Sequence, residues 1–359
     1  MQEKLFPYQV AILIYMTQIS VGIFSLPRVT AEAFGTNGWI GISIVSMIFV
    51  VNILLIGLVF HYSKGKSIFQ IFNSHLPNFL VKPFYIIIAL IYSSLSILIA
   101  KNFQLIIGMQ YYPTMPPSLF VIMVLLITYW LVRSGIYHIA KATVVFFITI
   151  LIVFVLGYNL GEFRLTRLTP FIFEGEKELL KKGNQVALHF LGIEMSLFLI
   201  PYIAKLKGAF KPVLFSQLLL TFIYSITCLI SFGFFSYDQL SNETYPLLTM
   251  FEYIEFPFIA RVEGIVIHLF LFEVLITIIV FFWGADQLIQ HAIPKISPRL
   301  SIICLLLVSF LCTIVVNTQV ELEKWIYFLR SAEFIIAFLL PILLLLLISI
   351  STLRKKLKK

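Results

Sequence analysis

The fold of this chain is decided by an interrupted apolar stretch near its start, Gln18-Ile19-Ser20-Val21-Gly22-Ile23-Phe24-Ser25-Leu26-Pro27-Arg28. Glycine permits backbone angles that other residues avoid, and proline fits the first turn of a helix that restarts. The surrounding residues, 8–34, are apolar over a length that crosses a bilayer. The stretch therefore predicts a membrane-spanning helix that unwinds near Gly22.

A second stretch carries the same signature, Phe190-Leu191-Gly192-Ile193-Glu194-Met195-Ser196, with Pro201 shortly after it. It repeats the Gly-Ile step nearly half a chain length later. Interrupted segments at matching places in two halves indicate a transporter fold built as an inverted repeat. A glycine kink at a helix-packing contact explains either segment alone, but the pairing favours two discontinuous helices.

The composition places both segments in a membrane protein. The chain has 359 residues, of which 60% are hydrophobic and 12% are charged, whereas about a quarter of the residues in soluble domains are charged. So few charges exclude a soluble enzyme, a disordered chain and a disulfide scaffold. Long apolar runs such as 338–350 favour helices over a transmembrane barrel. We therefore expect an all-α integral membrane protein.

Ten hydrophobic segments are predicted as transmembrane helices. They cover about 8–34, 38–62, 84–112, 117–132, 136–158, 184–203, 210–236, 261–289, 300–316 and 325–352. The interrupted segments are the first and the sixth, so the halves 8–158 and 184–352 form a 5+5 inverted repeat of opposite topology. Two connections have substructure: an amphipathic helix on the inner surface within 67–80, and a lid-like outer helix within 238–258.

The distribution of basic residues sets the orientation. Alternate connections and the C-terminal tail hold most of the lysines and arginines: Lys4, Lys64, Lys66, Lys82, Arg133, Lys141, Lys205, Lys207, Lys211, Lys295, Arg299, Arg354, Lys355, Lys356, Lys358 and Lys359. Cytoplasmic loops carry such an excess. Both termini are therefore expected in the cytoplasm, and an even number of spans agrees. The same bias accounts for the net charge of +9 without a nucleic-acid partner.

The two interruptions predict a binding site. The restarted half of helix 1 directs its positive dipole end and free N–H groups near Gly22 at the gap, which suits a carboxylate. The first half of helix 6 offers free carbonyls near residues 190–192, which suit an ammonium group or a metal cation. We expect an amino-acid zwitterion at the bilayer midplane. The candidate ligand-binding residues are Gly22, Ile23, Phe24, Ser25, Tyr92, Ser96, Leu191, Gly192 and Glu194.

Ionisable residues at membrane depth are costly and indicate function. Glu194, in the helix 6 interruption, has three interpretations: pairing with a ligand ammonium, carrying a proton, or capping loose backbone groups. Glu273 either completes a cation site beside helix 1 or satisfies a polar neighbour. Arg28 and Glu333 form an outer gate, or Arg28 pairs with Glu32 four residues on. We therefore assign Arg28, Glu273 and Glu333 as gating or ion-coupling residues.

The sequence contains no motif that indicates an enzyme, a nucleotide-driven pump or a metal site. It contains no GxGxxG, P-loop, HExxH or GxSxG motif, so we expect neither a nucleotide-driven pump nor a known hydrolase. Cys228, Cys304 and Cys312 lie in apolar runs without pairing or CxxC spacing, which is typical of small buried side chains. We expect no enzyme, no catalytic residues, no metal and no cofactor.

With these features in place, the chain resembles the B subunits of spore germinant receptors, the spore permease family of the amino acid–polyamine–organocation superfamily. The resemblance rests on Pro7-Tyr8-Gln9, Gly22-Ile23-Phe24-Ser25-Leu26-Pro27, Gly38-Trp39, Gly192-Ile193-Glu194, Tyr245-Pro246, and Phe256-Pro257-Phe258-Ile259-Ala260-Arg261-Val262-Glu263. It runs over essentially the whole chain.

The resemblance implies ten helices in a leucine-transporter-like fold, in agreement with the independent count. It also implies a multi-pass subunit in the inner membrane of a spore-forming bacterium, acting with a larger A subunit and a lipoprotein C subunit. Such a subunit binds an amino acid or a similar small nutrient and triggers germination. An amino-acid permease coupled to protons or sodium is the alternative, because both need the same interrupted helices.

Overall fold

The computed structural model describes residues 4–170, 179–204, 208–257, 261–316 and 318–357, and helices dominate this part of the chain. The α-helices are α1 (Pro7–Gln18), α2 (Leu26–Phe34), α3 (Gly38–Ser63), α4 (Ile68–His75), α5 (Asn78–Gln110), α6 (Pro117–Ser134), α7 (Ile136–Phe146), α8 (Ile152–Val155), α9 (Leu179–Ala187), α10 (Met195–Phe198), α11 (Phe210–Phe234), α12 (Tyr237–Asn242), α13 (Pro246–Glu252), α14 (Val262–Ala292), α15 (Pro298–Val315) and α16 (Gln319–Leu357). Within the described residues the β-structure is a single isolated bridge, between Leu5 and Ile203. The predicted all-α class is confirmed.

Eight segments of the described chain are long and apolar enough to cross a membrane: Leu26–Ser63, Asn78–Gln110, Pro117–Ser134, Ile136–Glu162, Phe210–Phe234, Val262–Ala292, Pro298–Val315 and Gln319–Ile350. The predicted spans 8–34 and 184–203 are divided into shorter helices. In the first, α1 ends at Gln18 and α2 begins at Leu26. In the second, α9 ends at Ala187 and α10 begins at Met195. The count of ten spans stays a prediction.

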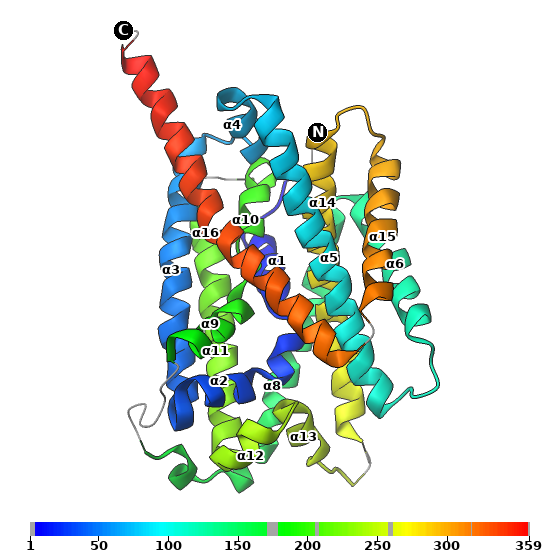
Figure 1. Ribbon diagram of the computed structural model, residues 1–359. Coiled ribbons are helices and arrows are strands. Elements are labelled where there is room, and N and C mark those ends of the chain that lie inside the picture. Colours follow the sequence, from blue (N-terminus) through cyan, green and yellow to red (C-terminus); the bar gives the residue numbers. More distant parts are fainter. Residues whose placement is uncertain (1–3, 171–178, 205–207, 258–260, 317, 358–359) are drawn as a thin grey trace.

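Helix α1 lies inside the bundle (Figure 1). It packs against α11 on one side and against α7 and α14 on the other. Leu13, Ile14 and Met16 are fully buried, and its apolar side chains are not confined to one face. A helix that is hydrophobic all round belongs in the interior. The long helices α3, α5, α11, α14 and α16 surround it (Figure 1).

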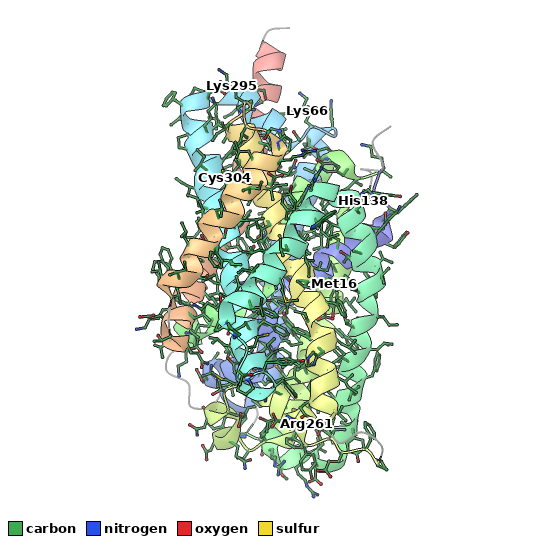
Figure 2. All side chains as sticks on the ribbon, turned by 90° about the vertical axis from the view of Figure 1, so that its right-hand side faces the viewer. Met16, Lys66, His138, Arg261, Lys295 and Cys304 are labelled. Carbon is green, nitrogen blue, oxygen red and sulfur yellow. The ribbon has the colours of Figure 1, made fainter. Side chains whose placement is uncertain are left out.

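Both ends of the bundle carry basic residues. The start of α1 and the end of α16 lie at the same end (Figure 1). Figure 2 shows Lys66 and Lys295 at that end, Arg261 at the other, and Met16 about halfway between them. The break after α1 is therefore near mid-depth. Lys205, Lys207, Lys358 and Lys359, together with residues 258–260 of the resemblance, fall outside the described part of the chain.

The two short helical regions sit at opposite ends of the bundle. At the end that carries the termini, α4 buries Ile68, Phe69 and Phe72 against the protein, and the ring of Phe69 stacks on His291 of α14 at 3.7 Å. The predicted short amphipathic helix is therefore present at Ile68–His75, with its apolar face packed against the bundle. Its place on the inner membrane surface stays a prediction. At the opposite end, α12 and α13 occupy the predicted lid region (Figure 1).

The interruption of helix 6 depends on Gly192. Its φ of +110° is in the range that L side chains rarely adopt. A Cβ atom at this position lies 3.1 Å from the carbonyl oxygen of Thr17 in α1. The backbones of the two interrupted helices therefore meet at a point where a side chain does not fit.

We expect Gly192→Ala to lower the free energy of unfolding by about 1–3 kcal/mol, because it adds both backbone strain and a close contact with Thr17. Thermal unfolding of the purified protein in detergent measures the effect. Gly157→Ala is the matched control, since a Cβ at Gly157 meets nothing within 4 Å. Equal melting temperatures for the two variants would contradict this role of Gly192.

Candidate functional site

A cavity of about 440 Å³ lies beside the interruption of helix 1. The residues of its wall that matter most here are Gln18, Gly22, Ser25, Arg28, His189 and Arg330. The wall extends to Tyr245, between α12 and α13, and to Lys324 near the start of α16. Sites for small molecules occupy about 300–1,000 Å³. The cavity therefore has the size of a small-molecule site at the predicted place.

The backbone of helix 1 changes conformation over seven residues. Ile19 and Ser20 are extended, with ψ angles of 129° and 177°. A 3₁₀ turn follows at Val21–Phe24, and Pro27 lies in the first turn of α2. A helix that starts here presents N–H groups without intrahelical partners. Gly22 and Ser25 are the predicted binding residues whose atoms border the cavity.

Ile23 and Phe24 point to a different place. Both are buried and border a second, much smaller cavity of about 20 Å³ that Glu273 also lines. The ring of Phe24 packs edge-on against Phe270 of α14, with 4.7 Å between centroids. The four consecutive residues predicted for ligand binding are thus divided between two sides of the interruption.

In helix 6, α9 is followed by a 3₁₀ turn at Leu188–Phe190 and an extended Leu191. The predicted free carbonyls are partly used by the protein. The side-chain amide of Gln18 donates to the carbonyl of Phe190 at 2.9 Å, and the N–H of Met195 donates to the carbonyl of Gly192 at 3.2 Å. The expectation of unpartnered carbonyls at these two residues is wrong, since helix 1 and α10 supply donors.

The end of α1 is satisfied in a similar way. The hydroxyl of Thr277 on α14 lies 3.0 Å from the carbonyl oxygen of Met16 and 2.9 Å from that of Ile19. Gln18 also reaches Gln217 of α11 at 2.9 Å. Side chains from α11 and α14 therefore help to bind the interrupted backbone into the bundle.

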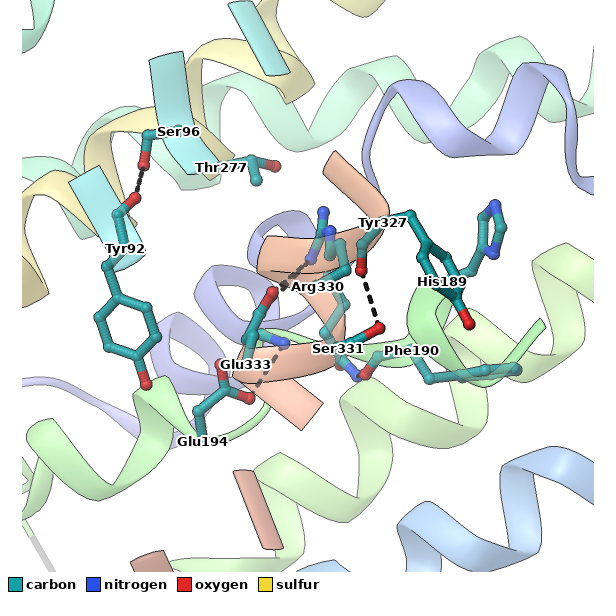
Figure 3. Close-up of polar contacts among 12 residues, drawn as sticks. Tyr92, Ser96, His189, Phe190, Glu194, Thr277, Tyr327, Arg330, Ser331 and Glu333 are labelled. Atoms are coloured by element: carbon teal, nitrogen blue, oxygen red, sulfur yellow. Dashed lines mark hydrogen bonds and ion pairs between the residues drawn. The ribbon is translucent and has the colours of Figure 1, made fainter. Parts of the chain in front are cut away.

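A buried charged cluster adjoins the cavity through Arg330, which lines the cavity wall. Figure 3 shows the residues of this cluster. Glu194 and Glu333 are both fully buried, and their carboxyl groups are neighbours. Arg330 forms an ion pair with Glu333 at 3.1 Å, and its side chain is 10% exposed. Glu194 accepts a hydrogen bond from the N–H of Gly192 at 3.0 Å. Of the three predicted roles of Glu194, backbone capping is therefore present in the structure.

The predicted ion pair between Arg28 and Glu333 is not the one that forms. Arg28 pairs instead with Glu32 at 3.3 Å, one turn along α2. The partner of Glu333 is Arg330, three residues earlier on α16. Of the two predicted arrangements, the structure therefore has the pair within one helix, because residues three or four apart lie on the same face. A gating role for Arg28 and Glu333 stays a prediction.

Tyr92 and Ser96 of α5 are fully buried and do not line the cavity. The Ser96 hydroxyl donates to the carbonyl of Tyr92 at 2.7 Å within the same helix. The Tyr92 hydroxyl is close to the two glutamates (Figure 3) and has no hydrogen-bond partner among the described residues. Of the pair, Tyr92 therefore belongs to the charged cluster.

Glu273 of α14 is buried in a separate polar contact. One carboxyl oxygen accepts a hydrogen bond from the Thr149 hydroxyl at 2.6 Å, and the other has no partner in the described part of the chain. The contact satisfies a polar neighbour, as one of the two predicted roles requires. A cation site beside helix 1 stays a prediction.

Tyr245 closes part of the cavity at the α12–α13 connection. Burial, together with the nearby Glu323 and against the opposing effect of Arg28, raises the pKa of Tyr245 to about 12. Its hydroxyl therefore stays protonated and accepts a hydrogen bond from Gln319 at 3.3 Å. The charge in this part of the wall comes from Arg28, Glu323 and Lys324.

Four residues of the site were not predicted from the sequence. Gln18 and Thr277 form hydrogen bonds with the interrupted backbone. Gln217 accepts a hydrogen bond from Gln18, and the ring of His189 faces Gly22. A Cβ atom added at Gly22 would lie only 2.6 Å from the Cδ2 atom of the His189 ring. A polar side chain inside an otherwise apolar span is the signal that could have identified each of them.

The amino-acid sequence is similar to those of spore germination proteins. A family model described as "Spore germination protein" matches residues 4–321. Spore germination protein B2 of Bacillus subtilis is 26% identical over 266 residues, which cover 73% of this chain and 72% of that protein. Spore germination protein GerQB of Bacillus cereus is 26% identical over 300 residues, 80% of each chain.

Solved structures agree on the fold. A Na⁺-coupled sialic acid symporter in a substrate-bound outward-open state matches with a TM-score of 0.67 and 12% identity, over 95% of this chain and 78% of that one. MhsT in complex with L-phenylalanine matches with a TM-score of 0.62 and 14% identity, over 94% of this chain and 87% of that one. At such identities the likeness concerns the fold, which is that of the leucine transporter. With a family model that spans nearly its whole length, this multi-pass membrane protein belongs to the spore germination protein (spore permease) family.

Proposed function

We propose that this chain is the membrane subunit of a spore nutrient receptor, in which an amino acid or a similar small nutrient binds in the cavity between the interrupted helices 1 and 6. The observation that carries the proposal is the cavity itself, which is bordered by the helix 1 backbone at Gly22 and by the guanidinium of Arg330. Membership of the spore germination protein family supplies the biological setting.

The chemistry of the cavity suits a ligand with a carboxylate. The start of the 3₁₀ turn at Val21 and the start of α2 carry the partial positive charge of helix N-termini. Arg330 adds a guanidinium, which binds carboxylates in bidentate geometry. The rest of the wall is mixed, with the hydroxyls of Ser25 and Tyr224 and the carboxylate of Glu323. This combination fits an amino acid better than an uncharged sugar.

Signalling in this proposal follows from differential affinity. A nutrient that binds one arrangement of the two interrupted helices more tightly shifts the population towards it. Larger A and lipoprotein C subunits then convert the shift into ion release. The proposal includes ten spans arranged as the repeats 8–158 and 184–352, a location in the inner membrane of a spore-forming bacterium, and both termini in the cytoplasm.

The cavity is tested by Gly22→Ala. The added Cβ lies 2.6 Å from the imidazole of His189, which a hydrogen bond between its Nδ1 and the carbonyl of Gln185 holds in place. The ring must move into the cavity, so we expect the nutrient concentration for half-maximal germination to rise about 5- to 150-fold, as ~1–3 kcal/mol of overpacking implies. Gly157→Ala is the control and should respond like the wild type. An unchanged response of Gly22→Ala spores with normal protein levels would contradict the assignment.

A proton- or sodium-coupled amino-acid permease is the alternative, because the fold is shared with transporters. A receptor subunit without its partners should show no concentrative uptake of any member of a panel of radiolabelled amino acids in proteoliposomes. The measurement is made with an imposed proton gradient and again with a sodium gradient. Sustained accumulation that depends on either gradient would replace the receptor proposal with the permease.

A further inference from the structure

We propose that Glu194 and Glu333 hold one exchangeable proton between them, and that the position of Arg330 determines how many protons this carboxyl pair carries. Nothing in the family likeness assigns a proton site to these residues. Glu194, Glu333 and Arg330 are buried together in the charged cluster beside the cavity.

The charge balance of the cluster requires a proton. Both carboxyl groups are fully buried, and they are neighbours. The cation paired with them in the described structure is Arg330, which contacts Glu333 at 3.1 Å. Two ionised carboxylates would leave a net buried negative charge, which costs several kcal/mol. Two carboxyl groups that share a site do not both ionise. One proton makes the cluster neutral.

The contacts of Glu194 are consistent with this proton. One of its oxygens accepts the N–H of Gly192, whereas the other has no donor among the described residues. The oxygen of Glu194 without a donor can therefore share a proton with the neighbouring carboxyl group of Glu333. The Tyr92 hydroxyl, also without a described partner, faces both carboxyl groups from α5.

The other titratable neighbours do not supply a second positive charge to the pair. Tyr224 of α11 and His189 of the 3₁₀ turn both lie near Arg330 and border the cavity. Tyr224 is a neutral donor to the carbonyl of His189 at 3.2 Å. A charged His189 would repel the adjacent guanidinium. In the described part of the site, Arg330 thus sets the charge that the pair must balance.

Arg330 links this pair to the cavity because it touches both. If a ligand carboxylate draws the guanidinium away from Glu333, the pair loses its cation. One proton then passes from solvent to the remaining carboxylate, and it returns to solvent when the ion pair reforms. This coupling step rests on the proposed function, but the shared proton itself does not.

The experiment counts protonated carboxyl groups by infrared spectroscopy of the full-length chain in lipid vesicles at neutral pH, without any nutrient. Glu194→Gln should lose one protonated carboxyl group, because Glu333 then balances Arg330 alone. Arg330→Gln should gain one, because neither carboxyl group has a cation. The double variant should show the wild-type number. Arg330→Gln imitates the withdrawal of the guanidinium by a ligand.

Glu32→Gln is the matched control, since Glu32 also pairs with an arginine on its own helix but is partly exposed, at 32%. Its spectrum should keep the wild-type carboxyl signal. The same number of protonated carboxyl groups in the wild type, Glu194→Gln and Arg330→Gln would overturn the proposal. So would a wild-type spectrum with no protonated carboxyl signal, which keeps the test decisive if a variant fails to insert. Because no nutrient is present, the result is independent of whether the cavity binds one.

Discussion

The architecture depends on satisfying the backbone where two helices are interrupted inside a membrane protein. A peptide group freed at that depth has no bulk water to bind, and leaving it unpaired costs about 1–3 kcal/mol or more. Gln18 crosses from helix 1 to the carbonyl of Phe190 in helix 6. Thr277 reaches the carbonyls at the end of α1 from α14. These few side chains make it possible for both helices to unwind.

The same contacts bring the two interruptions together. Gly192 lies against the carbonyl of Thr17, so the backbones approach more closely than side chains would permit. At the end of the bundle that carries the termini, the N–H of Leu5 donates to the carbonyl of Tyr202 at 2.8 Å. The segments before helix 1 and after helix 6 are thus joined as well. A movement of one interrupted helix is therefore expected to involve the other.

The buried charges are compensated, as the buried backbone groups are. Arg330 is almost buried, yet it borders the cavity and neutralises part of the glutamate pair. This double contact joins events in the cavity to the charge state of groups behind its wall. It also explains why a single arginine at this depth is tolerable, since the glutamates compensate it at close range.

Much of the fold followed from local patterns. Apolar runs predicted the helices, and the Gly-Ser-Pro stretches at 18–28 and 190–201 marked the interruption after α1 and the one between α9 and α10. The partners of charged groups were less accessible. The sequence offered Arg28 two possible ion-pair partners. Glu32 is four residues further along α2, and Glu333 could approach only through the tertiary fold. Likewise, Gly22 and Phe24 are two residues apart but face different cavities, because the 3₁₀ turn rotates successive side chains.

The sequence by itself determined the class of protein, the approximate helices and the two points of interruption, since these depend on hydrophobicity and on the backbone preferences of glycine and proline. Only the tertiary structure decided that Gln18 reaches Phe190, that Glu194 lies beside Glu333, and that Arg330 stands between this pair and the cavity. Those residues are far apart in the chain or on different helices. Their contacts depend on how the helices are rotated and packed, which no local pattern records.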